Sequence, residues 1–309
     1  MKGRLSFDSK AVFHLYQRTV DGLLLFYYAR DYIVFYTIIS VAAGKYGIRG
    51  LGLCQMPDHV HLLIGACDRK RAERFVQFYS SRYTAYFHRQ YGTSGVLFDH
   101  PFGMAEKVGA KKIRTAIAYL YNNPVEKKLC PYAADYRWNY LAYAASRNPF
   151  SAPTNLATCR RVFRRAVAEL EYCFRHSKPL NGVILAGMTR DMNEEEKKQL
   201  IDRIVLRYQF IDYKTLVSYY ESYPMMLLSF RSNTGSEYDI KEDFSPGSDK
   251  IYYSLLSAVE KMFGKDSFRK VLSLPEDKRR LNANALVYLT GASFRQVYKF
   301  LHLPQPPTE

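Results

Sequence analysis

The sequence predicts an α+β fold, with an antiparallel sheet that carries helices on one face and a mostly α-helical region after it. Within residues 1–148, segments typical of strands and helices follow the order strand, helix, strand, strand, helix, strand. This is the order of the split βαβ, ferredoxin-like arrangement. The face of such a sheet that lacks helices is free for a ligand, and we expect an extra helix to supply residues to it.

The elements of the sheet region are predicted from periodicity, helix caps and glycine or proline breaks. Asp31 is a candidate helix cap, Gly92 is expected to end the longest helix, and Asn123-Pro124 is expected to break the last one. We predict strands at 11–19, 48–55 and 59–67, a segment at 95–106 that begins as a fourth strand, and helices at 31–45, 70–91 and 110–122.

A change in composition near residue 150 divides the chain into two predicted domains, 1–148 and 149–309. Asn148-Pro149 and residues 151–153 have the composition of a linker. Asn193 and the three glutamates after it form a strong helix start. We predict helices at 159–176, 197–208, 249–263 and 281–301, and a polar loop at 229–248.

The charge of the chain favours a polyanionic partner. The 309 residues carry a net charge of +16. Residues 1–150 hold 21 basic and 10 acidic residues, a net charge of +11, against +5 for residues 151–309. Aromatic residues make up 15% of the chain, and basic residues interleaved with aromatic ones suit single-stranded nucleic acid. Many of the tyrosines are equally expected in the core.

The cysteines and the hydrophobic segments indicate a soluble, cytoplasmic protein. The five cysteines are scattered, without Cys-x-x-Cys spacing, which is typical of neither a disulfide framework nor a zinc finger. The longest mostly apolar run, residues 32–43, is shorter than the roughly 20 residues that cross a bilayer. We therefore expect no membrane partner.

His59 and His61 form the first part of a candidate site. Alternate residues of a strand share a face, so these two imidazoles point to the same side, and Val60 and Leu62 point to the other. Two neutral imidazoles side by side are two potential ligands of a metal ion. The same pair also occurs as ordinary exposed or hydrogen-bonded histidines, and this interpretation stays open.

Tyr119 and Asn123 form the second part. They are four residues apart in a predicted helix and so share a helix face. A tyrosine oxygen can attack a phosphodiester and hold DNA covalently, and an amide oxygen one turn away can complete a metal site begun by the histidines. With 27 tyrosines in the chain, a core position for Tyr119 is the alternative.

Five short motifs follow one another along residues 10–145. They are His14 with Arg18, residues 56–63 (MPDHVHLL), 87–92 (FHRQYG), 97–98 (LF) and 119–129 (YLYNNPVEKKL). In this order they resemble the single-tyrosine transposases of the HUH superfamily, most closely the REP-associated tyrosine transposases. Trp138 is a weak echo of a later motif, and the sequence departs from the pattern at Asp58, at 126–128 and at 100–101.

The resemblance implies a metal-dependent transposase that acts on single-stranded DNA next to a hairpin. His59 and His61, with Asn123, would hold a divalent Mg²⁺ or Mn²⁺. Tyr119 would be the nucleophile, forming a 5′-phosphotyrosine and freeing a 3′-OH that later rejoins the strands. The chain has no Gly-x-x-x-x-Gly-Lys-Ser/Thr loop, so we expect no nucleotide cofactor.

Basic and polar residues near these motifs are candidate DNA contacts, and a solvated basic face is their alternative. The segment 281–302 resembles the helix-turn-helix tails of some such transposases, with an ordinary helical hairpin as its alternative. The candidates are His14, Arg18, Arg82, Lys111, Lys112, Arg114 and Lys127, with Arg295, Gln296 and Lys299 in the tail.

Two other functions compete with the transposase. One is a domesticated DNA-binding regulator that keeps the fold and no longer cleaves. The other is an RNA-binding module, because the split βαβ arrangement also serves RNA recognition. The intact set His59, His61, Tyr119 and Asn123 favours cleavage over the regulator. The histidine pair and the lack of an aromatic RNP-like strand count against the RNA-binding module. We expect a monomer rather than a homodimer.

Overall fold

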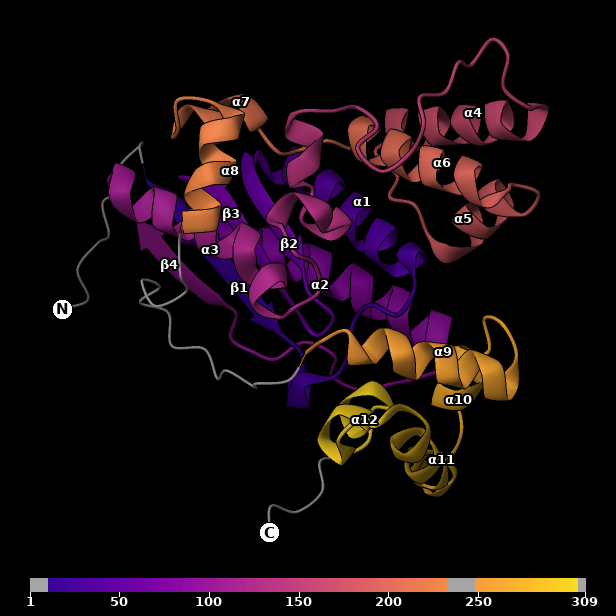
Figure 1. Cartoon of the computed structure of the whole chain (residues 1–309). Helices are drawn as coiled ribbons and strands as arrows, with labels where there is room; N and C mark the ends of the chain where they lie inside the picture. The colour runs from indigo at the N-terminus through magenta and orange to yellow at the C-terminus, as the bar shows by residue number, and fades with distance from the viewer. Residues whose placement is uncertain (1–10, 233–247, 305–309) are drawn as a thin grey trace, which may run out of the picture.

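The computed structural model describes residues 11–232 and 248–304, and a four-stranded sheet forms its centre (Figure 1). The strand order is β2-β3-β1-β4, and each neighbouring pair is antiparallel. This confirms the predicted α+β, ferredoxin-like sheet. The strands are β1 (Val12–Arg18), β2 (Gly50–Gln55), β3 (His59–Gly65) and β4 (Gly103–Lys107).

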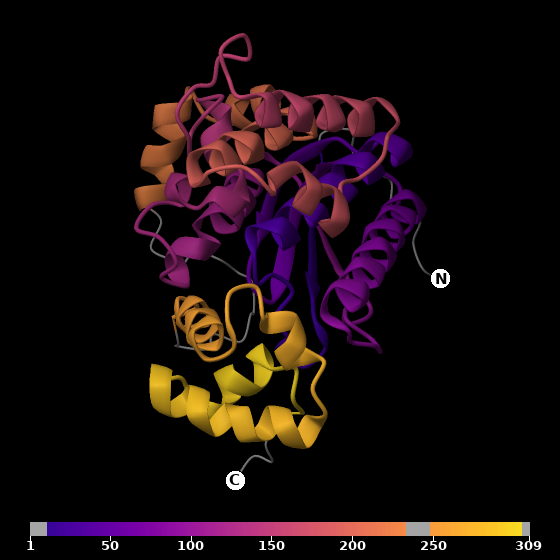
Figure 2. The same ribbon diagram turned by 90° about the vertical axis from the view of Figure 1, so that its right-hand side faces the viewer.

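Helices cover both faces of the sheet, and the alternation of strand residues decides which core each face joins. Val60, Leu62 and Ile64 of β3 pack into the core shared with α1 (Ala29–Tyr46) and α2 (Arg69–Tyr91). Leu63 points the other way and packs with α3 (Ala110–Glu126). Figure 2 shows the sheet between these two layers of helices. The predicted extra helix on the open face is therefore α3.

The start of α1 depends on the buried carboxylate of Asp31. Its Oδ2 accepts hydrogen bonds from the backbone N–H groups of Tyr27 and Tyr28, at 3.0 and 2.8 Å. The hydroxyl groups of Tyr86 and Tyr91 in α2 donate to the same carboxylate at 2.6 Å each. The helix begins at Ala29, two residues before the predicted start, so Asp31 is its third residue and Tyr28 is the N-cap. The Asp31 carboxylate still accepts from the N-cap backbone, and it joins α1 to α2.

Two predicted boundaries in the sheet region were wrong. The strand expected to begin near residue 95 is β4, which begins at Gly103, because Leu97 and Phe98 are buried as core residues before it. Pro124 was expected to break the helix at residue 122, whereas α3 continues to Glu126. Pro124 stands in the last turn, where its missing N–H costs the helix one hydrogen bond and the amide of Lys127 still bonds to the Asn123 carbonyl at 3.0 Å.

Beyond α3 the described chain is helical, as predicted. The cap of Asn193 is confirmed, since its side chain accepts a hydrogen bond from the Glu196 amide. Short 3₁₀ helices lie at η1 (Val20–Gly22), η2 (Ala133–Asp135), η3 (Arg137–Asn139) and η4 (Leu141–Ala144). The α-helices are α4 (Arg161–Arg175), α5 (Gly182–Thr189), α6 (Glu194–Arg207), α7 (Tyr213–Ser218), α8 (Tyr223–Ser232), α9 (Ile251–Phe263), α10 (Phe268–Leu272), α11 (Glu276–Thr290) and α12 (Phe294–Phe300).

These helices form three groups around the sheet region. Helices α4–α6 lie beside α1, α7 and α8 lie beside α3, and α9–α12 gather at one end of the sheet, drawn in orange and yellow (Figures 1 and 2). One buried core includes Phe35 of α1, Phe163 of α4 and Phe300 of α12, so it crosses the predicted boundary at residue 148. Most of the predicted loop 229–248 lies outside the described residues, and 229–232 belong to α8. No described helix is long and apolar enough to span a bilayer.

We expect Asp31→Ala to lower the free energy of unfolding by about 3–5 kcal/mol, roughly 1 kcal/mol for each of the four donors that lose their acceptor. Urea denaturation followed by circular dichroism measures the change. The control, Asp277→Ala, alters an exposed residue of α11 and should stay within about 0.5 kcal/mol of the wild type. Equal stabilities of the two variants would contradict this account of α1.

Candidate active site

The pairing of β1 with β3 brings the first part of the predicted site together. Arg18 lies opposite His59 and Tyr16 lies opposite His61, and His14 is diagonal to His61 in the same register. All five side chains leave the sheet on the face that carries α3, because alternate residues share a face. The predicted common orientation of His59 and His61 is therefore present.

The imidazole of His61 is the centre of the cluster and is fully buried. Its Nδ1 lies 3.0 Å from Nε2 of His14, and its Nε2 lies 3.2 Å from Nδ2 of Asn123. Burial, followed by the charges of His59, His14 and Arg18, lowers the pKa of His61 well below its usual value. Burial and Lys107 lower the pKa of His14 to about 4. Both rings are therefore neutral at pH 7, and one donates its proton to the other.

His59 is held by its neighbour in the chain. Its Nδ1 lies 2.6 Å from Oδ1 of Asp58, and its ring centroid lies 4.9 Å from that of His61. A carboxylate that accepts the Nδ1 proton fixes the tautomer with the lone pair on Nε2. Asp58, noted in the sequence only as a departure from a motif, is thus a partner of His59 that motif comparison missed.

Helix α3 carries Tyr119 and Asn123 across the same face. A Cβ atom on Gly52 of β2 would lie 3.1 Å from the Tyr121 hydroxyl oxygen and 3.3 Å from Cδ2 of Leu120, so the glycine permits the close approach of α3. The amide of Asn122 donates to the Phe230 carbonyl in α8 at 2.8 Å. Contacts on both sides of α3 therefore fix its position over the histidines.

Tyr119 lies beside the histidines, as predicted. Its ring centroid is 5.5 Å from that of His61 and 5.8 Å from that of His14, in edge-on contacts. The side chain is 3% exposed, so an external ligand reaches its hydroxyl only after a change of conformation. Tyr119 is as buried as the alternative of a core tyrosine predicts. Unlike an ordinary core position, however, its surroundings include the imidazoles of His14 and His61.

The cluster has the chemistry to hold a divalent cation. His59 and His61 can each present an Nε2 lone pair, because their Nδ1 atoms are engaged by Asp58 and His14. A half-turn of the Asn123 amide would bring its oxygen, in place of Nδ2, to the point 3.2 Å from His61 Nε2. Among the described residues, no group of three or more His, Cys, Asp or Glu side chains forms a metal site. Two imidazoles and one amide are the donors that fit here.

The candidate DNA contacts of the sheet region lie in different places. His14 is 2% exposed and contacts His61 rather than the surface. Arg18 and Lys127 are partly buried near the site, and Lys111, Lys112 and Arg114 are exposed in the first turns of α3. Arg82 is exposed on α2, which covers the opposite face of the sheet, and its guanidinium stacks 5.0 Å from the centre of the Phe78 ring.

The tail contains two helices joined at Gly291, which ends α11 in the left-handed conformation. Arg295 is exposed, but Gln296 accepts a hydrogen bond from the Ser293 amide at 3.0 Å as the cap of its own helix. Lys299, expected on an exposed face, turns towards Asp58, and its Nζ lies 3.7 Å from Oδ2. Of the three predicted DNA contacts in α12, only Arg295 has an exposed side chain in this conformation.

Tyr16 is a neighbour of the site that motif comparison missed. It is 38% exposed on a central strand, and its ring covers Gly103, where a Cβ atom would lie 1.8 Å from the ring. Its ring centroid is 6.2 Å from that of His14. The signal was present in the sequence, since Tyr16 alternates with His14 and Arg18 in the predicted strand.

Comparisons with known proteins find one matching family model and a similar solved structure. Residues 26–123 match the family model described as Transposase IS200 like. A structure of a REP-associated tyrosine transposase bound to a REP hairpin is similar to 52% of this chain and 98% of its own, with 12% identity and a TM-score of 0.38. No curated protein matches the chain. The matched segment includes His59, His61, Tyr119 and Asn123, so the part of the chain that carries the candidate site is similar to IS200-like transposases.

Proposed function

We propose that the protein is a metal-dependent single-stranded DNA endonuclease and strand transferase that acts next to hairpins. The observation that carries the proposal is the position of the Tyr119 ring, 5.5 Å from His61 and on the same helix face as Asn123. A nucleophile and a set of cation ligands on one face form the minimum for a metal-assisted displacement at phosphorus.

In the proposed reaction, the Tyr119 oxygen attacks a backbone phosphorus. The new bond joins the tyrosine oxygen to phosphorus, and the bond from phosphorus to the 3′ oxygen breaks. The departing oxygen takes a proton and becomes a 3′-OH, while the 5′ side stays on the protein as a phosphotyrosine. Attack by a 3′-OH reverses these steps and rejoins a strand without an external energy source.

His59, His61 and Asn123 would hold a divalent cation, Mg²⁺ or Mn²⁺, and the imidazoles favour Mn²⁺. Such a cation supplies stabilisation of the negative charge that grows on the phosphate during displacement. His14 and Asp58 would orient the two imidazoles from behind, through the contacts at 3.0 and 2.6 Å. We therefore propose that His14 is a positioning residue rather than a DNA contact.

DNA would approach along the face of β1. Arg18 and Lys127 near the site, with Lys111, Lys112 and Arg114 on α3, are proposed to contact phosphates. The exposed ring of Tyr16 is proposed to stack on a base beside the scissile phosphate. Arg295 would add a further phosphate contact only if α12 also reaches the DNA.

The burial of Tyr119 and His61 favours one alternative, a DNA-binding regulator that keeps the fold without cleaving. The two functions differ in one measurable product, the covalent protein–DNA adduct. The regulator would bind hairpin DNA and form no adduct under any condition.

The nucleophile is tested by incubating the protein with Mn²⁺ and a panel of labelled single-stranded hairpins from the native flanking repeats. We expect an adduct that survives denaturing electrophoresis in the wild type and is lost in Tyr119→Phe, because the nucleophilic oxygen is removed. Tyr121→Phe is the matched control on the same helix, since its hydroxyl only donates to the Leu51 carbonyl at 3.3 Å. An adduct in Tyr119→Phe refutes the assignment, and its absence from the wild type supports the regulator.

The ligands are tested by titrating Mn²⁺ and following the free ion by electron paramagnetic resonance. We expect His61→Ala to weaken Mn²⁺ binding by at least about 10-fold, because one ligand and the contact of Asn123 are lost together. His176→Ala, at the exposed end of α4, should leave the affinity unchanged. Equal affinities in the two variants would place the cation elsewhere.

The stacking role of Tyr16 is tested by fluorescence anisotropy with a labelled single-stranded oligonucleotide. We expect Tyr16→Ala to weaken binding by about 5- to 100-fold, the effect of removing one base–aromatic contact, and Tyr16→Phe to retain it. Tyr172→Ala alters a similarly exposed tyrosine of α4 and serves as the control. Unchanged binding by Tyr16→Ala would remove Tyr16 from the DNA path.

A further inference from the structure

The C-terminal helices reach the turn that carries the histidine motif. Lys299 of α12 places its Nζ 3.7 Å from Oδ2 of Asp58, and the other oxygen of that carboxylate lies 2.6 Å from Nδ1 of His59. The two charged side chains are largely buried, at 18% and 22% exposure. A continuous line of contacts therefore runs from α12 through Asp58 to His59.

Hydrogen bonds fix α12 at this position. The Tyr27 hydroxyl donates to the Phe300 carbonyl at 2.8 Å, and Nε2 of His302 lies 3.0 Å from the Leu24 carbonyl. Phe300 and Leu301 are fully buried. Because these partners belong to the segment between β1 and α1, the end of the chain is joined to the sheet region beside the turn at Asp58.

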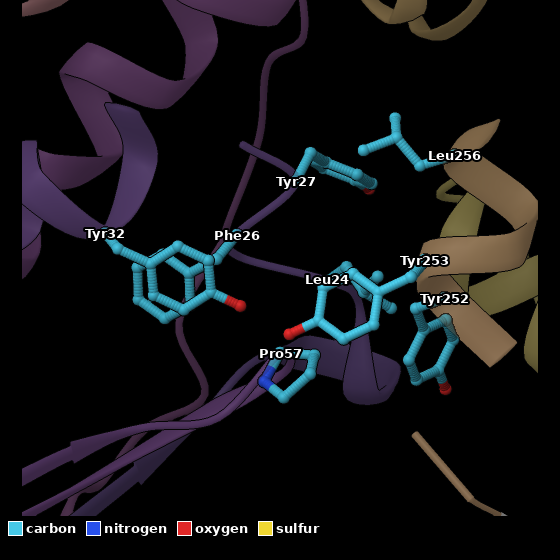
Figure 3. Close-up of a pocket in the computed structure, with 8 residues that line it drawn as sticks. All are labelled: Leu24, Phe26, Tyr27, Tyr32, Pro57, Tyr252, Tyr253 and Leu256. Carbon is cyan, nitrogen blue, oxygen red and sulfur yellow. The ribbon is translucent and has the colours of Figure 1, made fainter. Parts of the chain in front are cut away.

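Helix α9 approaches the same turn from another side. Figure 3 shows the ring of Pro57, which immediately precedes Asp58, facing aromatic side chains from the sheet region and from α9. The backbone N–H of Asp249, just before α9, donates to the Lys127 carbonyl at 3.3 Å. A small pocket lies between the sheet region and α9, and it is lined by Leu24, Phe26, Tyr27, Tyr32, Pro57, Tyr252, Tyr253 and Leu256.

The backbone at Gly22 leaves room for the lysine. Gly22 has a φ of +67°, and a Cβ atom there would lie 2.7 Å from Nζ of Lys299. The ammonium group thus lies against a residue without a side chain, which permits its approach to Asp58. Lys299 and Asp58 therefore form an ion pair at this position.

We propose that Lys299 is a positioning residue of the active site, which holds Asp58 by an ion pair so that Asp58 orients His59. The C-terminal helices then complete a site whose proposed nucleophile and cation ligands all lie before residue 124. The role of this ion pair in DNA cleavage rests on the proposed function, whereas the ion pair and its effect on His59 do not. Lys299 is accordingly separate from any DNA-reading role of α12.

A double-mutant cycle tests the ion pair. Asp58→Asn removes the charge and keeps an oxygen that can accept from His59, and Lys299→Met removes the ammonium and keeps the apolar length of the side chain. We expect the two changes to be non-additive in urea denaturation, with a coupling of at least about threefold in the unfolding equilibrium constant. Lys278→Met, at an exposed position of α11, should show no coupling with Asp58→Asn. Additive effects of Asp58→Asn and Lys299→Met would overturn the proposal.

The orientation of His59 is tested in the metal-free protein by long-range proton–nitrogen correlation spectra of ¹⁵N-histidine-labelled samples, with His59→Gln used to assign the signal. We expect Lys299→Met to shift the His59 ring nitrogens, Lys299→Arg to restore them, and Lys278→Met to leave them unchanged. An unchanged His59 signal in Lys299→Met would overturn the positioning role. Neither measurement depends on cleavage, so failure of the Tyr119 adduct test is distinguishable from failure here.

Discussion

The geometry of the candidate active site depends on the contact between α3 and the β1–β3 strand pair, which is made through the imidazole of His61. That ring is carried by β3, contacted at Nδ1 by His14 of β1 and at Nε2 by Asn123 of α3. Because it is fully buried and neutral, its two nitrogens cannot exchange these partners for water. Fixing this ring also fixes the distance between Tyr119 and the histidine strand.

The same burial creates a requirement for movement. A tyrosine that is 3% exposed cannot reach a DNA phosphate from outside, and His61 and Asn123 are also covered. Enzymes commonly expose or complete a site through a loop or domain motion before the chemical step. The proposed activity therefore includes a conformational step. The C-terminal helices contact the turn before the histidine strand through Lys299, so a movement of that turn would affect their contact with it.

Local patterns in the sequence predicted much of the sheet region, because strand alternation and helix periodicity are local properties. They placed His59 and His61 on one face and Tyr119 with Asn123 on one helix face, and they gave the order of the strands and helices correctly. The continuation of α3 past Pro124 was missed, since surrounding contacts outweigh one lost hydrogen bond. The contact of Lys299 with Asp58 joins residues far apart in the chain, and no local pattern reports such a pair. The roles of His14, Tyr16 and Lys299 needed the pairing of strands and the packing of α12.

The most direct test of the central claim is to identify the residue that becomes attached to DNA. After reaction with Mn²⁺ and a hairpin oligonucleotide, nuclease and trypsin digestion would leave a nucleotide on a peptide from residues 115–127, which contains Tyr119 and Tyr121. Fragmentation of that peptide by tandem mass spectrometry should locate the added phosphate on Tyr119. A nucleotide on Tyr121, or on any peptide that lacks Tyr119, would contradict the account.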